Sequence, residues 1–167
     1  MINKINKMSQ SEFIKVFANI FENSSWIALE LYKEKPFNNF KNLSTKMLNI
    51  FDKITKEKHL KILKAHPDLA GKTKIDSLTT NSKEEQSNAG LDQCSIEEFV
   101  EFRNLNDKYK KKFGFPFIYA VKSKSKIEIL NNFKERVTYD INVEFIEATK
   151  QVKKIASLRI NEINKND

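Results

Sequence analysis

The sequence has few residues that interrupt helices, form cross-links or bind metals. It contains 3 glycines, 3 prolines, 2 histidines and 1 cysteine among 167 residues. With Cys94 alone, no internal disulfide is possible, which is compatible with a reducing compartment. His59, His66 and Cys94 lie in separate segments and show no ligand spacing for zinc, so we expect no metal. The dinucleotide fingerprint GxGxxG and the Walker phosphate loop are also missing.

Long apolar runs are missing as well. No stretch approaches the roughly 20 apolar residues that span a bilayer, so we expect no membrane segment. The N-terminal "MINKINKMSQ" lacks the apolar core of a signal peptide, and the C-terminal "NEINKND" is not a Ser-Lys-Leu peroxisomal signal. These features predict a cytoplasmic protein.

The charge is positive, with a formal net charge of +8. The lysines are spread along the chain and mixed with glutamates, as on an ordinary solvated surface. Basic and aromatic residues do not interleave as in an RNA-stacking sheet, so we expect no nucleic-acid partner. A positive field favours a small anionic ligand. A basic all-α module that binds nucleic acid or protein stays open as an alternative, and it predicts salt-sensitive binding.

Apolar residues at helical spacing recur along most of the chain. Ser9 and Glu12 form a capping-box pattern before a helical run from Phe13 to Phe21. Between Ile127 and Ile160 there is no glycine or proline, which predicts one long helix or two joined near Tyr139. The expected fold is all-α: a compact single-domain helical bundle over residues 1–167.

One apolar stretch, "FGFPFIYAV" at 113–121, does not fit a helix. It contains Gly114 and Pro116, and Pro116 cannot donate a ladder hydrogen bond. We therefore predict a short, extended, buried connector rather than a strand. Its backbone N–H and C=O groups need partners, and a polar ligand could supply some of them.

A histidine stands directly before a proline at His66–Pro67. The residue before proline is pushed out of the α region, so the helix over 60–65 should end there with His66 at its exposed mouth. Gly71 then permits a tight turn. A single histidine is more often structural than catalytic, and His59 is interpreted as a surface or groove residue.

Two further positions have competing interpretations. Ser82 and Glu85 form a capping-box pattern that would open a short helix towards Leu91, and such a helix start also suits an anionic ligand. Arg159 is in phase with apolar residues such as Val152. It either extends its charged end to solvent, or grips a buried carboxylate with two parallel hydrogen bonds.

Three segments in this order, "AHPDLAGK", "LTTNSKEEQSNAGLD" and "FRNLNDKYKKKFGFPFIYAV", resemble the OHCU decarboxylases. That family converts 2-oxo-4-hydroxy-4-carboxy-5-ureidoimidazoline (OHCU) to (S)-allantoin and CO2 in urate breakdown. The likeness extends to "FIKVFANIFENSSW" near the start and "QVKKIASLRI" near the end. One departure is Ser25, where family members commonly have proline before Trp26.

The resemblance implies an all-α, cofactor-free enzyme that acts on a small anionic substrate and is often a homodimer. It makes His66 the catalytic histidine, with Glu85 orienting it or hydrogen-bonding the substrate. The substrate-binding residues that it implies are Pro67, Ser82, Lys83, Glu84, Glu85, Gln86, Phe117, Ile118, Tyr119, Ala120, Val121 and Arg159. A related decarboxylase acting on another ureido or imidazoline acid stays open, because specificity depends on pocket geometry.

Overall fold

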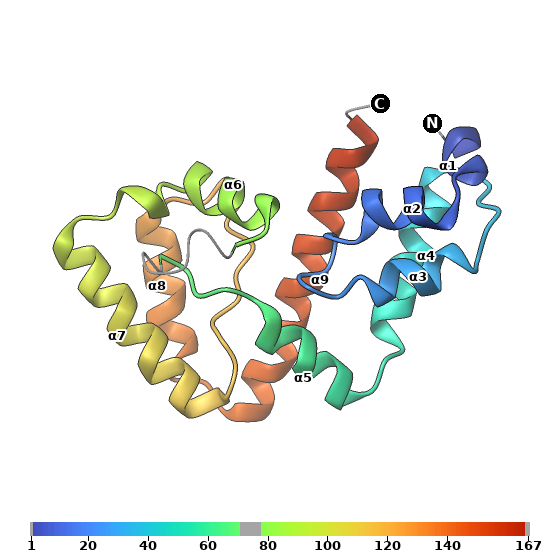
Figure 1. Cartoon of the computed structure of the whole chain (residues 1–167). Helices are drawn as coiled ribbons and strands as arrows, with labels where there is room; N and C mark the ends of the chain where they lie inside the picture. The colour runs from blue at the N-terminus through green and yellow to red at the C-terminus, as the bar shows by residue number, and fades with distance from the viewer. Residues whose placement is uncertain (1, 71–77, 166–167) are drawn as a thin grey trace. The chain divides into compact units, whose positions relative to one another are not determined.

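The computed structural model describes residues 2–70 and 78–165, and within them the fold is all-α, as predicted, with no strand. The chain divides into two units (Figure 1). The first unit takes residues 1–62 and 153–167, and the second takes residues 63–152. That one domain spans residues 1–167 stays a prediction. None of the described helices is both long enough and apolar enough to cross a membrane.

The first unit is built around an aromatic core. Ser9 and Glu12 form the predicted capping box at the start of α2, but this helix ends at Phe17. Ile20 and Phe21 lie in the turns that follow α2, and their side chains are buried. Their apolar spacing therefore reflects burial and not a continuing helix. The helices that begin in this unit are α1 (Ile2–Lys7), α2 (Gln10–Phe17), α3 (Trp26–Tyr32), α4 (Phe40–Asp52) and α5 (Lys56–Ala65).

The second unit holds the helices that follow α5. The gap between α8 and α9 contains Tyr139, so the alternative of two helices is correct for this region. Gly114 ends α7 with a φ of +77°, a conformation that glycine adopts without steric cost. The elements are α6 (Thr80–Asn88), the 3-10 helix η2 (Leu91–Gln93), α7 (Ile96–Phe113), α8 (Lys126–Arg136) and α9 (Ile141–Lys165), which continues into the first unit.

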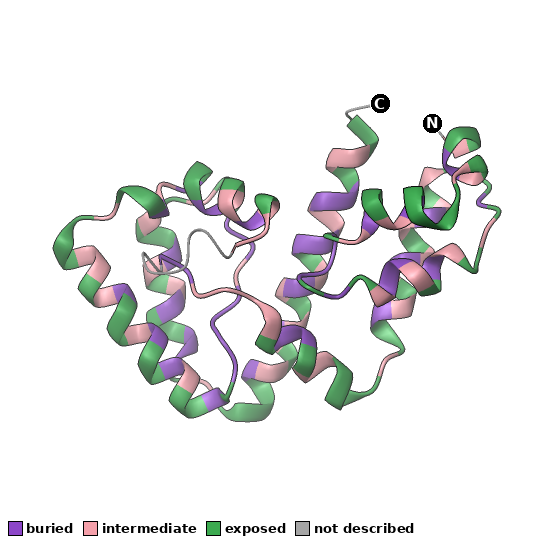
Figure 2. Ribbon diagram, in the orientation of Figure 1, coloured by how far each residue is buried: buried purple, intermediate pink, exposed green. Residues whose placement is uncertain are grey.

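The predicted connector is present between α7 and α8. Residues 116–121 have no regular secondary structure, and all of them except half-buried Tyr119 are buried (Figure 2). Phe117 stacks on Phe133 of α8, with ring centroids 3.9 Å apart, and meets Tyr109 of α7 edge-on at 5.5 Å. Such aromatic pairs contribute beyond their buried area. The connector is therefore held in the core of this unit by its side chains, and its backbone is left to make polar contacts.

Candidate active site

His66 lies where the sequence predicts it. Helix α5 ends at Ala65, and the backbone N–H of His66 donates to the carbonyl of Leu63 at 3.2 Å. His66 and Pro67 are both half-buried. The imidazole is thus carried at a helix exit rather than inside the core. Gly71, predicted to make a tight turn, lies outside the described residues.

Gln86 of α6 fastens the turn that follows Pro67. Its Oε1 accepts from the backbone N–H of Ala70 at 3.0 Å, and its Nε2 donates to the carbonyl of Asp68 at 3.3 Å. Ala70 has a φ of +54°, which is uncommon for a residue with a side chain. Both ends of the Gln86 amide therefore hold this turn. Its predicted contact with substrate stays a prediction.

Helix α7 fixes the same turn from another side. Asn106, which is buried, donates from Nδ2 to the carbonyl of Leu69 at 2.9 Å. Lys110 forms an ion pair with Asp68 at 2.6 Å. Neither residue was singled out in the sequence. Their positions in the motif "FRNLNDKYKKKF", four residues apart on one helix face, are the signal that could have indicated them.

The predicted capping box of Ser82 and Glu85 is wrong. The N-cap of α6 is Thr79, whose side chain accepts from the backbone N–H of Ser82 at 3.4 Å. Threonine is itself a favoured N-cap residue, so the helix begins three residues earlier than the pattern indicated. Glu85 consequently lies inside α6, and helix capping does not account for it.

The predicted site residues on α6 differ in burial according to the helix face on which they lie. Ser82 and Gln86, one turn apart, are buried, whereas Lys83 and Glu85 are half-buried. Glu84 is exposed to solvent. The structure therefore gathers Ser82, Glu85 and Gln86 away from solvent, and it leaves Glu84 on the outer face, where its predicted substrate contact has no structural support.

Two side chains bind the connector backbone, and neither was expected. Arg136 of α8 donates from Nη1 to the carbonyl of Ile118 at 2.8 Å. Gln151 of α9 accepts from the backbone N–H of Ala120 at 3.1 Å. In the part of the chain that the structure describes, the amides of Tyr119 and Val121 have no hydrogen-bond partner.

Arg136 belongs to a buried network that joins three helices. Its Nε lies 3.1 Å from both carboxylate oxygens of Glu144, and its Nη2 also donates to that carboxylate. The hydroxyl of Tyr109 donates to Glu144 as well. Burial, followed by the hydrogen bond to the Glu144 carboxylate, raises the pKa of Tyr109 far above its ordinary value. Tyr109 therefore keeps its phenolic proton and donates it to Glu144.

Arg159 belongs to the first unit, and its contacts decide against one of the two interpretations of its sequence position. It is 2% exposed, and its Nη1 donates to the carbonyl of Asn19 at 2.9 Å and to the Glu22 carboxylate at 3.1 Å. The guanidinium does not extend to solvent, so that interpretation is wrong. Glu22, also 2% exposed, was missed because an acid in a polar turn looks like an ordinary surface residue. Substrate binding by Arg159 stays a prediction.

The described residues contain no group of three or more histidine, cysteine, aspartate or glutamate side chains placed to hold a metal ion. The predicted site residues of the second unit offer an imidazole, a carboxylate, a hydroxyl and peptide groups. Together these can move protons and hydrogen-bond a small polar molecule.

Sequence comparison identifies the family. The profile described as OHCU decarboxylase matches residues 6–161. A 2-oxo-4-hydroxy-4-carboxy-5-ureidoimidazoline decarboxylase of Halalkalicoccus jeotgali is 35% identical over 97% of this chain and 90% of its own length. A uric acid degradation bifunctional protein of Bacillus sp. (strain TB-90) is 41% identical over 97% of this chain, which spans only 32% of that longer protein.

Solved structures agree with the sequence comparison. A crystal structure of (S)-allantoin synthase matches with a TM-score of 0.76 and 27% identity over 97% of this chain and 53% of that one. A crystal structure of OHCU decarboxylase in the presence of (S)-allantoin matches with a TM-score of 0.73 and 25% identity, over 89% of this chain and 96% of that one. With a family match over nearly its whole length, the chain belongs to the OHCU decarboxylase family.

Proposed function

We propose that this protein catalyses the cofactor-independent decarboxylation of OHCU to (S)-allantoin and CO2 in urate breakdown. The observation that carries the proposal is the position of His66. It lies at the exit of α5, beside a turn that Gln86 of α6 fastens with two hydrogen bonds. Both segments come from the motifs that define the resemblance to the family. A half-buried imidazole on a rigid turn suits proton transfer.

The substrate itself provides the electron sink. When the bond between the ring carbon and the carboxylate breaks, its electron pair moves towards the adjacent ring C=N, and that nitrogen takes up a proton. The resulting enol then loses its hydroxyl proton while the neighbouring ring carbon gains one. The net change is loss of CO2 and uptake of one proton. The protein's task is therefore to orient the ring and to deliver a proton to one face of that carbon.

We assign the proton transfers to His66, because an unperturbed imidazole titrates at a pKa of about 6.5. Glu85 orients this imidazole or accepts from substrate N–H groups, and Ser82 hydrogen-bonds the polar edge of the ring. The peptide groups of residues 117–121 bind the ureido arm. A ureido group carries N–H donors beside a carbonyl, so it complements the N–H and C=O of an extended peptide.

The surroundings of the reaction are also part of the proposal. We place the enzyme in the cytoplasm as a homodimer with no nucleic-acid partner. A lone cysteine fits a reducing compartment, and lysines mixed with glutamates fit a solvated surface. Light scattering after size exclusion should give twice the 19.6 kDa chain mass. Nucleic acid should not be retained at physiological salt.

The direct test of the activity uses substrate generated in place, because urate oxidase and hydroxyisourate hydrolase together convert urate to OHCU. Adding the protein should accelerate CO2 release in proportion to its concentration, without any added cofactor. If CO2 release follows the rate without protein, the proposal is wrong. A related ureido acid, supplied in parallel, distinguishes an OHCU enzyme from a decarboxylase that prefers another imidazoline.

A further inference from the structure

We infer that Gln151 and Arg136 are positioning residues, which hold one edge of the connector so that its other edge is presented to the substrate's ureido arm. The inference rests on the proposed function, because it assumes that residues 117–121 bind substrate. It adds two residues, from α9 and α8, that do not touch the substrate themselves. They act through the direction that they impose on the connector backbone.

The pattern of hydrogen bonds carries this inference. In an extended chain, the N–H and C=O of one residue point to the same side, and those of the next residue point to the opposite side. Arg136 binds the C=O of Ile118 and Gln151 binds the N–H of Ala120, two residues further on. Both contacts therefore occupy one edge. The N–H and C=O of Tyr119, and the N–H of Val121, point to the other edge.

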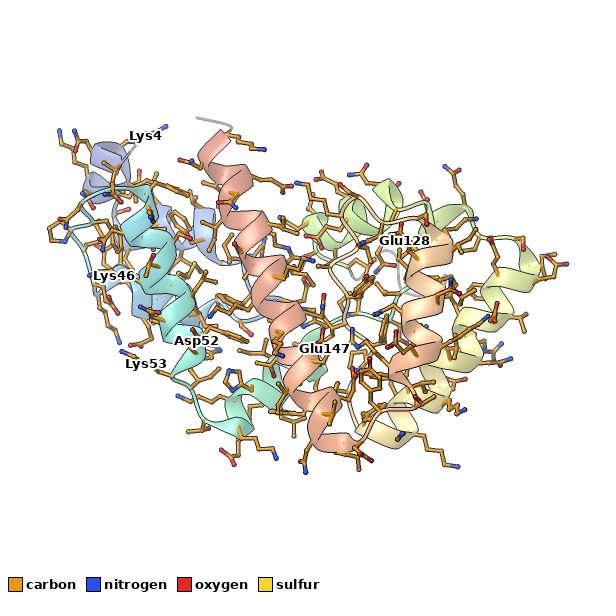
Figure 3. All side chains as sticks on the ribbon, turned by 180° about the vertical axis from the view of Figure 1, so that it is seen from behind. Lys4, Lys46, Asp52, Lys53, Glu128 and Glu147 are labelled. Atoms are coloured by element: carbon orange, nitrogen blue, oxygen red, sulfur yellow. The ribbon has the colours of Figure 1, made fainter. Side chains whose placement is uncertain are left out.

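Each of the two side chains is held in a single orientation. The Nε2 of Gln151 donates to the carboxylate of Glu147 at 2.7 Å, one turn earlier on α9. Glu147 is labelled on this helix in Figure 3. Because the amide nitrogen is engaged there, Oε1 is the end that meets Ala120. Arg136 is clamped by Glu144, and its guanidinium carbon lies 4.6 Å from the ring centre of Phe117. Gln151 and Arg136 therefore hold the connector through its backbone, and Arg136 also contacts it through the ring of Phe117.

This arrangement defines what the open edge can recognise. Tyr119 offers a donor and an acceptor side by side, which matches the carbonyl and the N–H of a ureido group. If the connector rotated about its long axis, the N–H and C=O of Tyr119 would turn away from the ureido group. Their hydrogen bonds to the substrate would then be lost. The contacts to Ile118 and Ala120 oppose this rotation. A ligand without a ureido arm should be indifferent to them.

The test compares three variants with the wild-type enzyme. Gln151→Met keeps the side-chain length but removes the acceptor for Ala120. The double variant Glu147→Gln, Gln151→Glu exchanges the amide and the carboxylate, so an acceptor oxygen again faces Ala120. Lys150→Met, at an exposed position on the same helix, is the control. The readouts are amide hydrogen exchange at Ala120 without ligand, calorimetric affinity for (S)-allantoin, and the melting temperature.

Gln151→Met should speed exchange at Ala120 and weaken (S)-allantoin binding about tenfold, the usual scale for one lost or misaligned hydrogen bond in a binding site. KM should rise by a similar factor and kcat should change less. The double variant should recover most of both losses, and Lys150→Met should lose neither. Unchanged exchange at Ala120, or a loss of affinity that the double variant does not recover, would overturn the inference. Failure of the proposed function is a separate result, in which the wild-type enzyme itself makes no (S)-allantoin.

Discussion

Among the described residues, a buried arginine–glutamate pair lies in each unit, and the two pairs hold different parts of the chain. In the second unit, Arg136 and Glu144 lie eight residues apart, and their network includes Tyr109 and the connector carbonyl of Ile118. In the first unit, Arg159 reaches Glu22 across 137 residues and joins the last helix to the turn after α2. One pair orders a short piece of backbone, and the other ties the end of the chain to its beginning.

Arg136 and Arg159 are both buried, so burial alone does not show whether an arginine also binds a ligand. Arg136 donates from Nε and Nη2 to the Glu144 carboxylate and from Nη1 to the carbonyl of Ile118. Such a group stabilises its surroundings and has no role in the chemistry itself. His66 and Pro67, by contrast, are only half-buried. Loss of a buried charge partner should therefore reduce stability, and loss of His66 should reduce activity.

The largest effect is expected at the histidine of the second unit. His66→Gln should lower the rate of decarboxylation about 10²- to 10⁴-fold, the usual contribution of general acid–base catalysis, with an unchanged melting temperature. The matched control is His59→Gln in the first unit, where the ring packs edge-on against Phe51 at 4.7 Å. It should keep wild-type turnover. Steady-state kinetics on both variants measure the difference. Near-wild-type turnover of His66→Gln would remove His66 from the mechanism.

Arg136→Met should produce the largest loss of stability. It leaves the Glu144 carboxylate buried without its cation, which typically costs about 3–5 kcal/mol. The control is Lys134→Met on the same helix, because Lys134 pairs with Glu101 at the surface, where an ion pair contributes about 0–1 kcal/mol. Denaturant unfolding measures both. Equal losses for the two variants would show that the buried network contributes nothing beyond an ordinary surface pair.

Glu85→Gln separates chemistry from helix formation on α6. Since Thr79 rather than Ser82 caps the helix, removing the charge at Glu85 should leave the melting temperature unchanged. The rate should fall about 100-fold, because the imidazole loses its orienting carboxylate or the substrate loses an acceptor. Thermal melts and kinetics on the same preparation provide the measurement. A stable variant with full activity would remove Glu85 from the mechanism.

Arg159→Lys tests whether the arginine of the first unit binds substrate. An ammonium lacks the planar pair of donors that a carboxylate or a ring oxygen accepts from guanidinium, so affinity for (S)-allantoin should fall at least about tenfold. Lysine can still donate to Glu22, and the melting temperature should drop only slightly. Calorimetric titration beside a melting curve measures both. Unchanged affinity would remove Arg159 from the substrate-binding residues and limit it to its contacts with Glu22 and Asn19.

The smallest effect is expected at an exposed acid, Glu128, at the start of α8 (Figure 3). The backbone N–H of Ser125, helped by Lys124 and the Ser125 hydroxyl, lowers the pKa of Glu128 to about 2. A depressed carboxyl pKa contributes stability above the unfolded value of 4.5, and that stability is lost as the pH falls towards 2. The melting temperature of Glu128→Gln should thus lie slightly below wild type at pH 7, and the difference should shrink as the pH falls from 4.5 towards 2. A constant difference would contradict the assignment.

Local patterns in the sequence predicted much of this fold. Apolar spacing, the Ser9 capping box and the Ala65–His66 boundary all depend on residues close together in the chain, and each is present. Pro116 within an apolar run likewise indicated the extended connector. The failure at Ser82 was local too, since Thr79 competed for the same cap.

What could not be predicted depends on contacts between distant residues. Glu22 and Arg159 are 137 residues apart, and the apolar phase of Arg159 on its helix does not indicate which acid it meets. Gln151 and Arg136 sit among lysines and glutamates on helices whose exposed residues are also charged, so nothing local marks them as partners of a backbone. Only the packing of α8 and α9 around the connector brings their polar atoms to Ile118 and Ala120.

The most direct test of the central claim, that His66 delivers a proton to one face of the substrate, is the enantiomeric composition of the product. OHCU generated from urate is converted in D2O, and the allantoin is analysed by circular dichroism and mass spectrometry. The wild-type enzyme should form (S)-allantoin with one deuterium on the newly protonated ring carbon, and His66→Gln should lose both the rate and the enantiomeric excess. Racemic allantoin from the wild-type enzyme would contradict the claim, because the proton would then come from bulk solvent to either face.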